Sequence, residues 1–152
     1  TEQEFIQQAE GLKGRLYRTA WLYLGSEACA VDAVDEAVYQ GFLHYKRLRQ
    51  PEYFATWMTR ILINACNAEL RRRKRELAVA ELPETAAEAF DAPLREAVAR
   101  LPRELRAVVV LRYFQGLTLA ETAQALDIPP GTVSTRQRKA LSLLKLHLTE
   151  EV

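Results

Sequence analysis

Apolar residues recur every three or four positions along most of the chain, which is the spacing of amphipathic helices. The pattern predicts helices over residues 3–24, 27–45, about 52–75, 94–100, 103–114, 119–126 and about 130–148. No segment shows the turn-flanked alternation of a β-strand. The sequence therefore predicts an all-α protein.

The second predicted helix carries two different stripes. Its expected core face consists of Val31, Val34, Val38 and Phe42. Its acidic stripe consists of Asp32, Asp35 and Glu36. Such a stripe is most often a solvated surface, and a docking surface for a basic partner is the alternative.

The third predicted helix follows a basic loop that ends at Pro51. Its expected core face consists of Phe54, Trp57, Ile61, Ala65 and Ala68. The candidates for binding nucleic acid are Arg49 of the loop and Trp57, Arg60, Asn64, Arg71 and Arg72 of the helix. Rings stack on exposed bases, amides bond base edges and cations hold the backbone, so this set suits unpaired DNA. The alternatives are that Trp57 belongs to the core and that the basic helix end interacts with the helix dipole.

A change in composition divides the chain. Residues 77–93 carry four acidic and no basic side chains and contain Pro83 and Pro93, which is typical of a linker. They separate residues 1–76 (12 basic and 10 acidic side chains) from residues 94–152 (9 basic and 6 acidic). We therefore expect two small helical domains joined by a flexible acidic linker, the C-terminal one a four-helix unit.

The last two predicted helices form a helix-turn-helix. Thr118 is the expected N-cap of the first, and the turn over residues 127–131 ends it and starts the second at a proline. The second helix is expected to bury Val133, Ala140, Leu141, Leu144 and Leu148. Its outward face consists of Thr132, Ser134, Thr135, Arg136, Arg138 and Lys139. That face could contact phosphates and base edges in a major groove, whereas two ordinary amphipathic helices joined by a turn are the alternative.

Composition restricts the classes of site. Cys29 and Cys66 lie far apart in apolar patterns, so we interpret them as buried thiols in a reducing cytosol. His44 and His147 are isolated, and we expect no metal, cofactor or catalytic set. No apolar run approaches membrane-spanning length, so we expect a cytoplasmic protein without direct membrane insertion. The net charge of only +1 predicts weak DNA binding by the isolated chain, which suggests a larger partner.

Three motifs, taken in order, resemble bacterial sigma factors of the extracytoplasmic-function (ECF) class. They are DAVDEAV at 32–38, LRQPEYFATWMTRILINACNAELRRRKR at 48–75 and LPRELRAVVVLRYFQGLTLAETAQALDIPPGTVSTRQRKAL at 101–141. The resemblance implies that the first motif docks on the coiled coil of the polymerase β′ subunit. It implies that the second melts and reads the minus-ten element, and that the third reads the minus-thirty-five element.

The resemblance also implies roles for single residues. The polymerase contacts would be Asp32, Asp35 and Glu36. Asn64 and the loop at 49–53 would capture a base flipped from the non-template strand of the minus-ten element. The other residues that contact this element would be Trp57, Arg60, Arg71 and Arg72. The residues that face bases of the minus-thirty-five element would be Ser134, Thr135, Arg138 and Lys139, with Thr132 and Arg136 on phosphates. The sequence differs from the residues usual in the family at four places: Ala55, Gln50-Pro51, Ser134 and Gln137.

The implied partners are core RNA polymerase, promoter DNA and an anti-sigma factor that covers the polymerase-binding faces. No small-molecule substrate and no enzymatic activity are implied. The alternative is a helix-turn-helix regulator that binds palindromic DNA as a dimer without polymerase, its N-terminal domain sensing a ligand or dimerising. A third class is a small helical enzyme or protein-interaction module. The carboxylates are scattered and have no His or Cys partner, which argues against catalysis.

Overall fold

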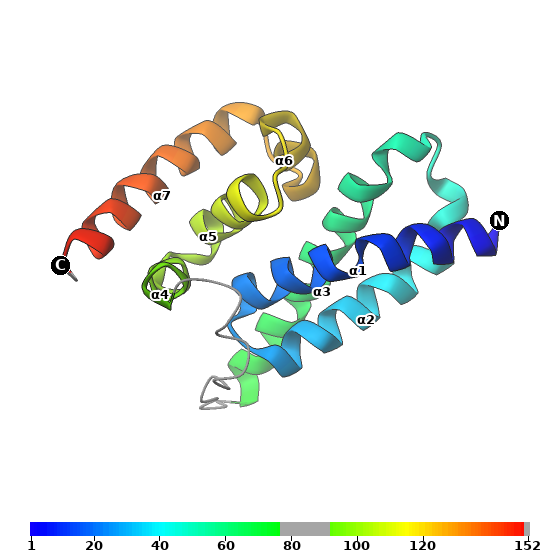
Figure 1. Ribbon diagram of the computed structural model, residues 1–152, viewed down its shortest axis with the longest axis horizontal. Helices are drawn as coiled ribbons and strands as arrows, with labels where there is room; N and C mark the ends of the chain where they lie inside the picture. The colour runs from blue at the N-terminus through cyan, green and yellow to red at the C-terminus, as the bar shows by residue number, and fades with distance from the viewer. Residues whose placement is uncertain (77–91, 151–152) are drawn as a thin grey trace.

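The computed structural model describes residues 1–76 and 92–150 (Figure 1). Regular secondary structure in these two ranges is entirely helical, which confirms the all-α prediction. The α-helices are α1 (Glu2–Leu24), α2 (Glu27–His44), α3 (Phe54–Glu76), α4 (Ala92–Arg100), α5 (Arg103–Val109), α6 (Leu119–Leu126) and α7 (Pro130–Glu150). The shorter elements are the 3-10 turns η1 (Tyr45–Arg47) and η2 (Pro51–Tyr53) and the π-helical turn η4 (Val110–Phe114).

Two element boundaries differ from the sequence prediction. The helix expected over residues 103–114 is an α-helix, α5, that continues as the π-helical η4. Helix α4 begins at Ala92, so the last two residues of the predicted linker 77–93 are helical. Pro93 fits there because the first turn of a helix has no use for its backbone donor. The rest of that linker, residues 77–91, lies outside the described residues.

Helices α1, α2 and α3 pack together as the N-terminal unit (Figure 1). Thr1 caps α1 in a reciprocal capping box with Glu4, and Gly25 (φ 72°) ends the helix in the left-handed conformation. The largest fully buried side chains of this unit are Phe5, Leu16, Val34, Met58 and Leu62. Gly41 allows α2 to approach α3 closely, since a Cβ there would lie 2.6 Å from Met58 Sδ.

The core stripe predicted for α2 is wrong at its ends. Val31 and Phe42 are 42% and 40% exposed. The buried face instead consists of Cys29, Ala30, Ala33, Val34, Ala37 and Gly41. Small residues let neighbouring helices approach closely. The face of α2 that carries small residues is therefore the buried one, although larger apolar side chains lie on another face. Ala68 of α3 and Leu141 of α7 are also expected in the core but are exposed.

Helices α4 to α7 form the C-terminal unit, and α6 and α7 are the predicted helix-turn-helix. Thr118 caps α6 in a capping box with Glu121, Asp127 (φ 56°) ends α6, and Pro130 is the first residue of α7. The N-cap and the turn predicted from the sequence are therefore confirmed. A small buried cluster holds α5, α6 and α7 together: Val108, Ala123 and Val133.

The two units pack against each other and share a core. Helix α3 lies against α6, and α1 lies against α4 and η4 (Figure 1). One continuous cluster of buried residues extends from Phe5 of α1 to Leu144 of α7. The hydrophobic pattern predicts each helix separately but carries no signal for this contact, because it reports which face is apolar and not which helix covers that face.

Candidate functional site

The acidic stripe of α2 faces solvent along its whole length. Asp32, Asp35 and Glu36 are all exposed. The opposite face of α2 is buried through its alanines, so the packing of the N-terminal unit orients the carboxylates outward. Glu36 Oε1 accepts a hydrogen bond from Gln40 Nε2 at 2.8 Å. The structure thus brings the three predicted docking residues onto one accessible surface.

Exposed apolar side chains, which the sequence analysis missed, extend this acidic surface. Tyr39, Phe42 and Leu43 are 56%, 40% and 51% exposed. Tyr39 lies one helical turn after Asp35 and Leu43 lies one turn further, so the helical spacing of the acidic stripe already contained the signal. Phe42 and Leu43 also line a hollow of about 280 Å³ beside the start of α1. Carboxylates beside exposed apolar side chains are typical of a surface that binds another protein.

The cationic and amide side chains predicted for the opened strand lie exposed along α3 and the loop before it. They are Arg49, Arg60, Asn64, Arg71 and Arg72. Arg60, Asn64 and Arg71 share one face of α3 by their spacing. Arg72 Nη2 forms an ion pair within α3 with Oε2 of the half-buried Glu69 at 2.8 Å.

Trp57 is half-buried and lies in an aromatic cluster. Its ring centroid is 6.1 Å from that of Phe54 and 6.5 Å from that of Tyr45. The ring packs against the main core of the N-terminal unit. This geometry favours the interpretation of Trp57 as a core residue over that of a free stacking platform.

The outward face of α7 is held in position from beneath. Thr135, Arg138 and Lys139 are exposed, and Thr132, Ser134 and Arg136 are half-buried. Arg112 of η4 donates from Nε to Gln137 Oε1 at 3.0 Å and from Nη1 to the Leu117 carbonyl at 2.8 Å. The Gln137 side chain therefore anchors α7 to η4.

The structure brings the two predicted DNA surfaces together, although the sequence analysis places them on separate domains. Arg60 and Asn64 of α3 and Arg136 of α7 line the same cavity of about 190 Å³. Arg60 Nη2 lies 3.3 Å from Asp127 Oδ2 in the helix-turn-helix turn, and Arg136 Nη2 lies 3.8 Å from Glu104 Oε2. Both pairs are partly solvated and individually weak. The Arg60–Asp127 pair joins α3 to the helix-turn-helix, whereas the Arg136–Glu104 pair lies within the C-terminal unit.

Comparison with known proteins places this geometry in a family. Sigma-70 region 2 matches residues 9–76, and Sigma-70, region 4 matches residues 97–146. The ECF RNA polymerase sigma factor SigM of Mycobacterium tuberculosis is 32% identical over 136 residues, covering 86% of the chain and 69% of SigM. The chain belongs to the ECF RNA polymerase sigma factors. Sigma factors are specificity subunits of RNA polymerase that direct promoter recognition and transcription initiation, and as a class they are not enzymes.

This sigma factor is also similar to RNA polymerase sigma factor SigV of Bacillus subtilis, with 29% identity over 145 residues that cover 91% of the chain and 87% of SigV. Its fold matches that of the sigma factor RpoE from Bartonella quintana, solved in complex with the anti-sigma factor NepR. The TM-score is 0.83 at 20% identity, covering 96% of this chain and 97% of RpoE. CnrH, solved with the cytosolic domain of CnrY, matches with a TM-score of 0.81 at 19% identity, covering 100% and 92%.

The family assignment decides between the functions that the sequence leaves open. A dimeric helix-turn-helix regulator is not favoured, because Sigma-70 region 2 matches the N-terminal unit that this alternative assigns to ligand sensing or dimerisation. Among the described residues, no helix of this sigma factor is long and apolar enough to span a membrane. No group of three or more His, Cys, Asp or Glu residues in the same ranges could hold a metal ion.

Proposed function

We propose that this sigma factor docks on core RNA polymerase through α2, captures one strand of the minus-ten element on α3 and reads the minus-thirty-five element with α7. Residues 1–76 would form the first domain, residues 94–152 the second, and residues 77–93 the tether. The observation that carries the proposal is the exposure of polar and charged side chains on all three helices, within the segments that match regions 2 and 4.

The proposed polymerase contact combines steering with burial. The carboxylates of Asp32, Asp35 and Glu36 would attract a basic partner surface and fix its orientation. Tyr39 and Leu43, exposed on the same face, would supply the apolar area that gives an interface most of its affinity. A partner that satisfies both is a basic protein surface with an apolar stripe.

The proposed minus-ten contact stabilises the opened strand. Flipping a base out of the stack costs a few kcal/mol, so the protein must supply a similar amount by holding it. Asn64 is suited to a base edge, because an amide donates and accepts hydrogen bonds at once. The cations that would hold the backbone are Arg49, Arg60, Arg71 and Arg72. Trp57 would contribute only the part of its ring that the core leaves accessible.

The proposed minus-thirty-five contact uses the start of α7 in a major groove. Ser134, Thr135, Arg138 and Lys139 would reach base edges, and Thr132 and Arg136 would bind phosphates. Ser134 is short where the family usually has a basic residue, so it cannot make a bidentate contact to guanine. We therefore propose a base preference that differs from that of relatives with a basic residue at this position.

We also propose that an anti-sigma protein binds this sigma factor and covers the α2 face. The solved complex of RpoE with NepR supports this partner class, and the exposed Tyr39, Phe42 and Leu43 offer apolar area for it. The complex would be cytoplasmic, and it would lie at the inner face of the membrane where the anti-sigma protein is membrane-anchored.

Reconstitution with core RNA polymerase tests the proposed function. We expect the purified chain to bind the core enzyme and to direct transcription from a limited set of start sites, which sequencing of the transcripts identifies. A shared pair of upstream elements among those sites is the expected result. Failure to bind the core enzyme after removal of any inhibitor would overturn the proposal, and so would binding of palindromic duplex DNA by the free chain as a dimer.

A further inference from the structure

The cavity of about 190 Å³ is lined by cations from three helices. These cations are Arg60 of α3, Arg103 of α5 and Arg136 of α7. The amides of Asn64 and Asn67, both on α3, line it as well. All five side chains end in N–H donors, and the guanidinium group in particular matches the oxygens of a phosphate. The lining therefore fits a tetrahedral oxyanion.

Two carboxylates also line the cavity, and they leave the site positive. With Glu104 and Asp127, the three guanidinium groups give a sum of +1. The two carboxylate side chains are 69% and 77% exposed, and each lies 3.8 Å and 3.3 Å, respectively, from its arginine. Ion pairs as exposed as these are weak, so an anion that enters can displace the carboxylates into solvent. Arg103 forms no ion pair with another residue in the described ranges.

Two donors of the cavity have no part in the proposed DNA contacts, namely Asn67 and Arg103. Tyr23 Oη donates to Asn67 Oδ1 at 2.7 Å, which occupies the amide oxygen and leaves the two N–H donors of Nδ2 for a ligand. Burial raises the pKa of Tyr23 to about 12, whereas the charge of Arg103 acts to lower it. The Tyr23 hydroxyl therefore remains a donor at neutral pH, and the positive charge of Arg103 lies near it.

The size and the access of the cavity restrict the ligand further. A volume of about 190 Å³ holds about six water molecules, whereas drug-sized ligands occupy sites of about 300–1,000 Å³. One or two phosphoryl groups fit, and a nucleoside attached to them does not. Arg60, Asn64 and Arg103 are exposed, so a small anion can enter from solvent.

We propose that this cavity binds a small phosphate-bearing anion, of the size of inorganic phosphate or pyrophosphate, through Arg60, Arg103, Arg136 and the Asn67 amide. The inference goes beyond the proposed function, because this binding needs neither polymerase nor promoter. A phosphate of a DNA strand carries the same chemistry. It also carries a nucleoside on each side, for which the cavity has no room, so the free anion is the favoured source.

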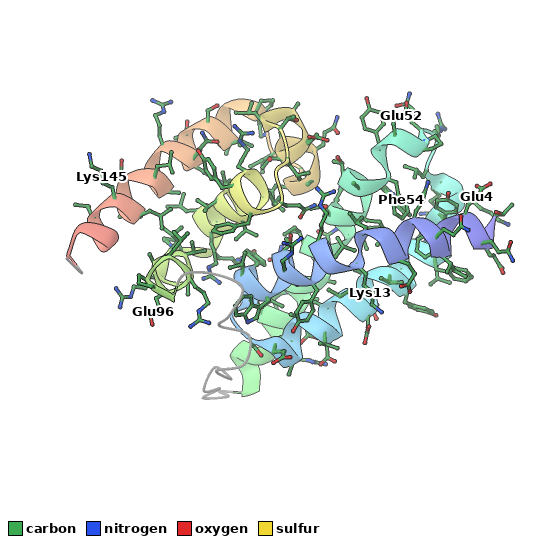
Figure 2. All side chains as sticks on the ribbon, viewed as in Figure 1. Glu4, Lys13, Glu52, Phe54, Glu96 and Lys145 are labelled. Carbon is green, nitrogen blue, oxygen red and sulfur yellow. The ribbon has the colours of Figure 1, made fainter. Side chains whose placement is uncertain are left out.

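Titration of pyrophosphate into the full chain, followed by phosphorus NMR in a chloride buffer at pH 8, tests the site. We expect a dissociation constant on the order of 0.1–1 mM, because several charge-assisted hydrogen bonds oppose the cost of association. Arg103→Gln and Arg136→Gln should each raise it about tenfold. Lys13, labelled in Figure 2, is exposed on α1 and lies outside the cavity lining. Lys13→Gln removes the same charge and should leave the affinity unchanged.

Two variants of nearly unchanged shape should move the affinity in opposite directions. Asn67→Asp can still accept from the Tyr23 hydroxyl but places a negative charge in the cavity, so it should abolish binding. Asp127→Asn removes a competing carboxylate at a left-handed position (φ 56°), a conformation that asparagine also adopts. It should tighten binding up to about fivefold. Circular dichroism checks that the helices remain, and a folding defect cannot tighten binding.

The outcomes separate this site from a strand contact and from the proposed function. Absence of pyrophosphate binding up to about 10 mM overturns the inference, and so does equal affinity of the wild type, Arg103→Gln and Asn67→Asp. A second arm replaces pyrophosphate with single-stranded DNA of about ten nucleotides. If the variants weaken binding of this DNA while pyrophosphate does not bind, the cavity serves the strand and the inference is overturned. Failure to bind core polymerase would overturn the proposed function and leave the anion site standing, because the titration uses the free chain.

Discussion

The guanidinium of Arg106 lies over the ring of Tyr23, with its carbon 5.8 Å from the ring centroid, and Nη1 donates to the Tyr23 backbone carbonyl. Its Nη2 donates to the Leu101 carbonyl at 3.2 Å. Tyr23 Oη donates in turn to Asn67 Oδ1 at 2.7 Å. Burial lowers the pKa of Arg106 and raises the pKa of Tyr23 to about 12. Both groups stay protonated at neutral pH, and together they join α5 to the end of α1 and to α3.

Replacement of Arg106 by lysine should destabilise the fold although it keeps the positive charge. A lysine ammonium cannot donate to two separate carbonyls and cover the Tyr23 ring as the planar guanidinium does. We expect Arg106→Lys to lower the free energy of unfolding by about 1–2 kcal/mol, measured by urea denaturation. Arg18→Lys, on the exposed face of α1, is the control and should change it little.

Charge reversal on α2 should abolish binding to core polymerase. Asp35→Arg combined with Glu36→Arg turns the attraction for a basic partner into repulsion, while both positions are exposed and not part of the core. Binding is measured by co-elution with the core enzyme, and circular dichroism checks that the helices remain. Glu10→Arg with Glu96→Arg changes the net charge equally at other exposed positions and should still bind. Transcription retained by the α2 variant would refute the docking assignment.

Asn64→Ala should weaken promoter opening more than initial closed binding. The amide is proposed to hold a base only after that base leaves the stack, so its loss affects the opened complex selectively. Permanganate footprinting measures opening, and band shifts with holoenzyme measure closed binding. Gln7→Ala, at an exposed position of α1, should leave both unchanged. Equal defects of Asn64→Ala in the two steps would count against this role.

Glu121 should make stability depend on pH in the acidic range. Its pKa is lowered mainly by the hydrogen bond from the Thr118 backbone N–H, with further side-chain bonds from Thr118 and Thr56. A carboxylate whose pKa falls on folding stabilises the fold above its unfolded value, about 4.3, and that contribution is lost as pH falls through the folded value. Glu121→Gln, which can keep the capping box, should flatten this part of the pH profile of thermal unfolding. An unchanged profile would contradict the assignment.

Both cysteines should be unreactive in the folded protein. Cys66 and Cys29 are buried, and burial raises the pKa of the Cys66 thiol to about 12, so the nucleophilic thiolate is scarce at pH 8. A colorimetric disulfide reagent should detect no rapidly reacting thiol in the native chain and two after denaturation in urea. Rapid reaction of one thiol in the native state would show that the N-terminal unit opens locally.

The sequence predicts single helices well because their signals are local. The capping box from Thr118 to Glu121 and the proline that starts α7 act within one turn of chain, and the structure reproduces both. The predicted α2 stripe is wrong at its ends, Val31 and Phe42, because the hydrophobic pattern favours large side chains for the core. The close approach of α2 and α3 at Gly41 instead buries alanines and leaves Phe42 exposed.

The amino-acid sequence by itself determined the helices, the helix-turn-helix and the motifs that indicate a sigma factor, because periodicity, capping and motif spacing are properties of neighbouring residues. Only the tertiary structure decided how the two units pack. The contacts of Gln115 with Thr19 and Thr59 join positions 96 and 56 residues apart. No local pattern reports such a pairing, since it depends on which buried polar groups meet after the helices have packed.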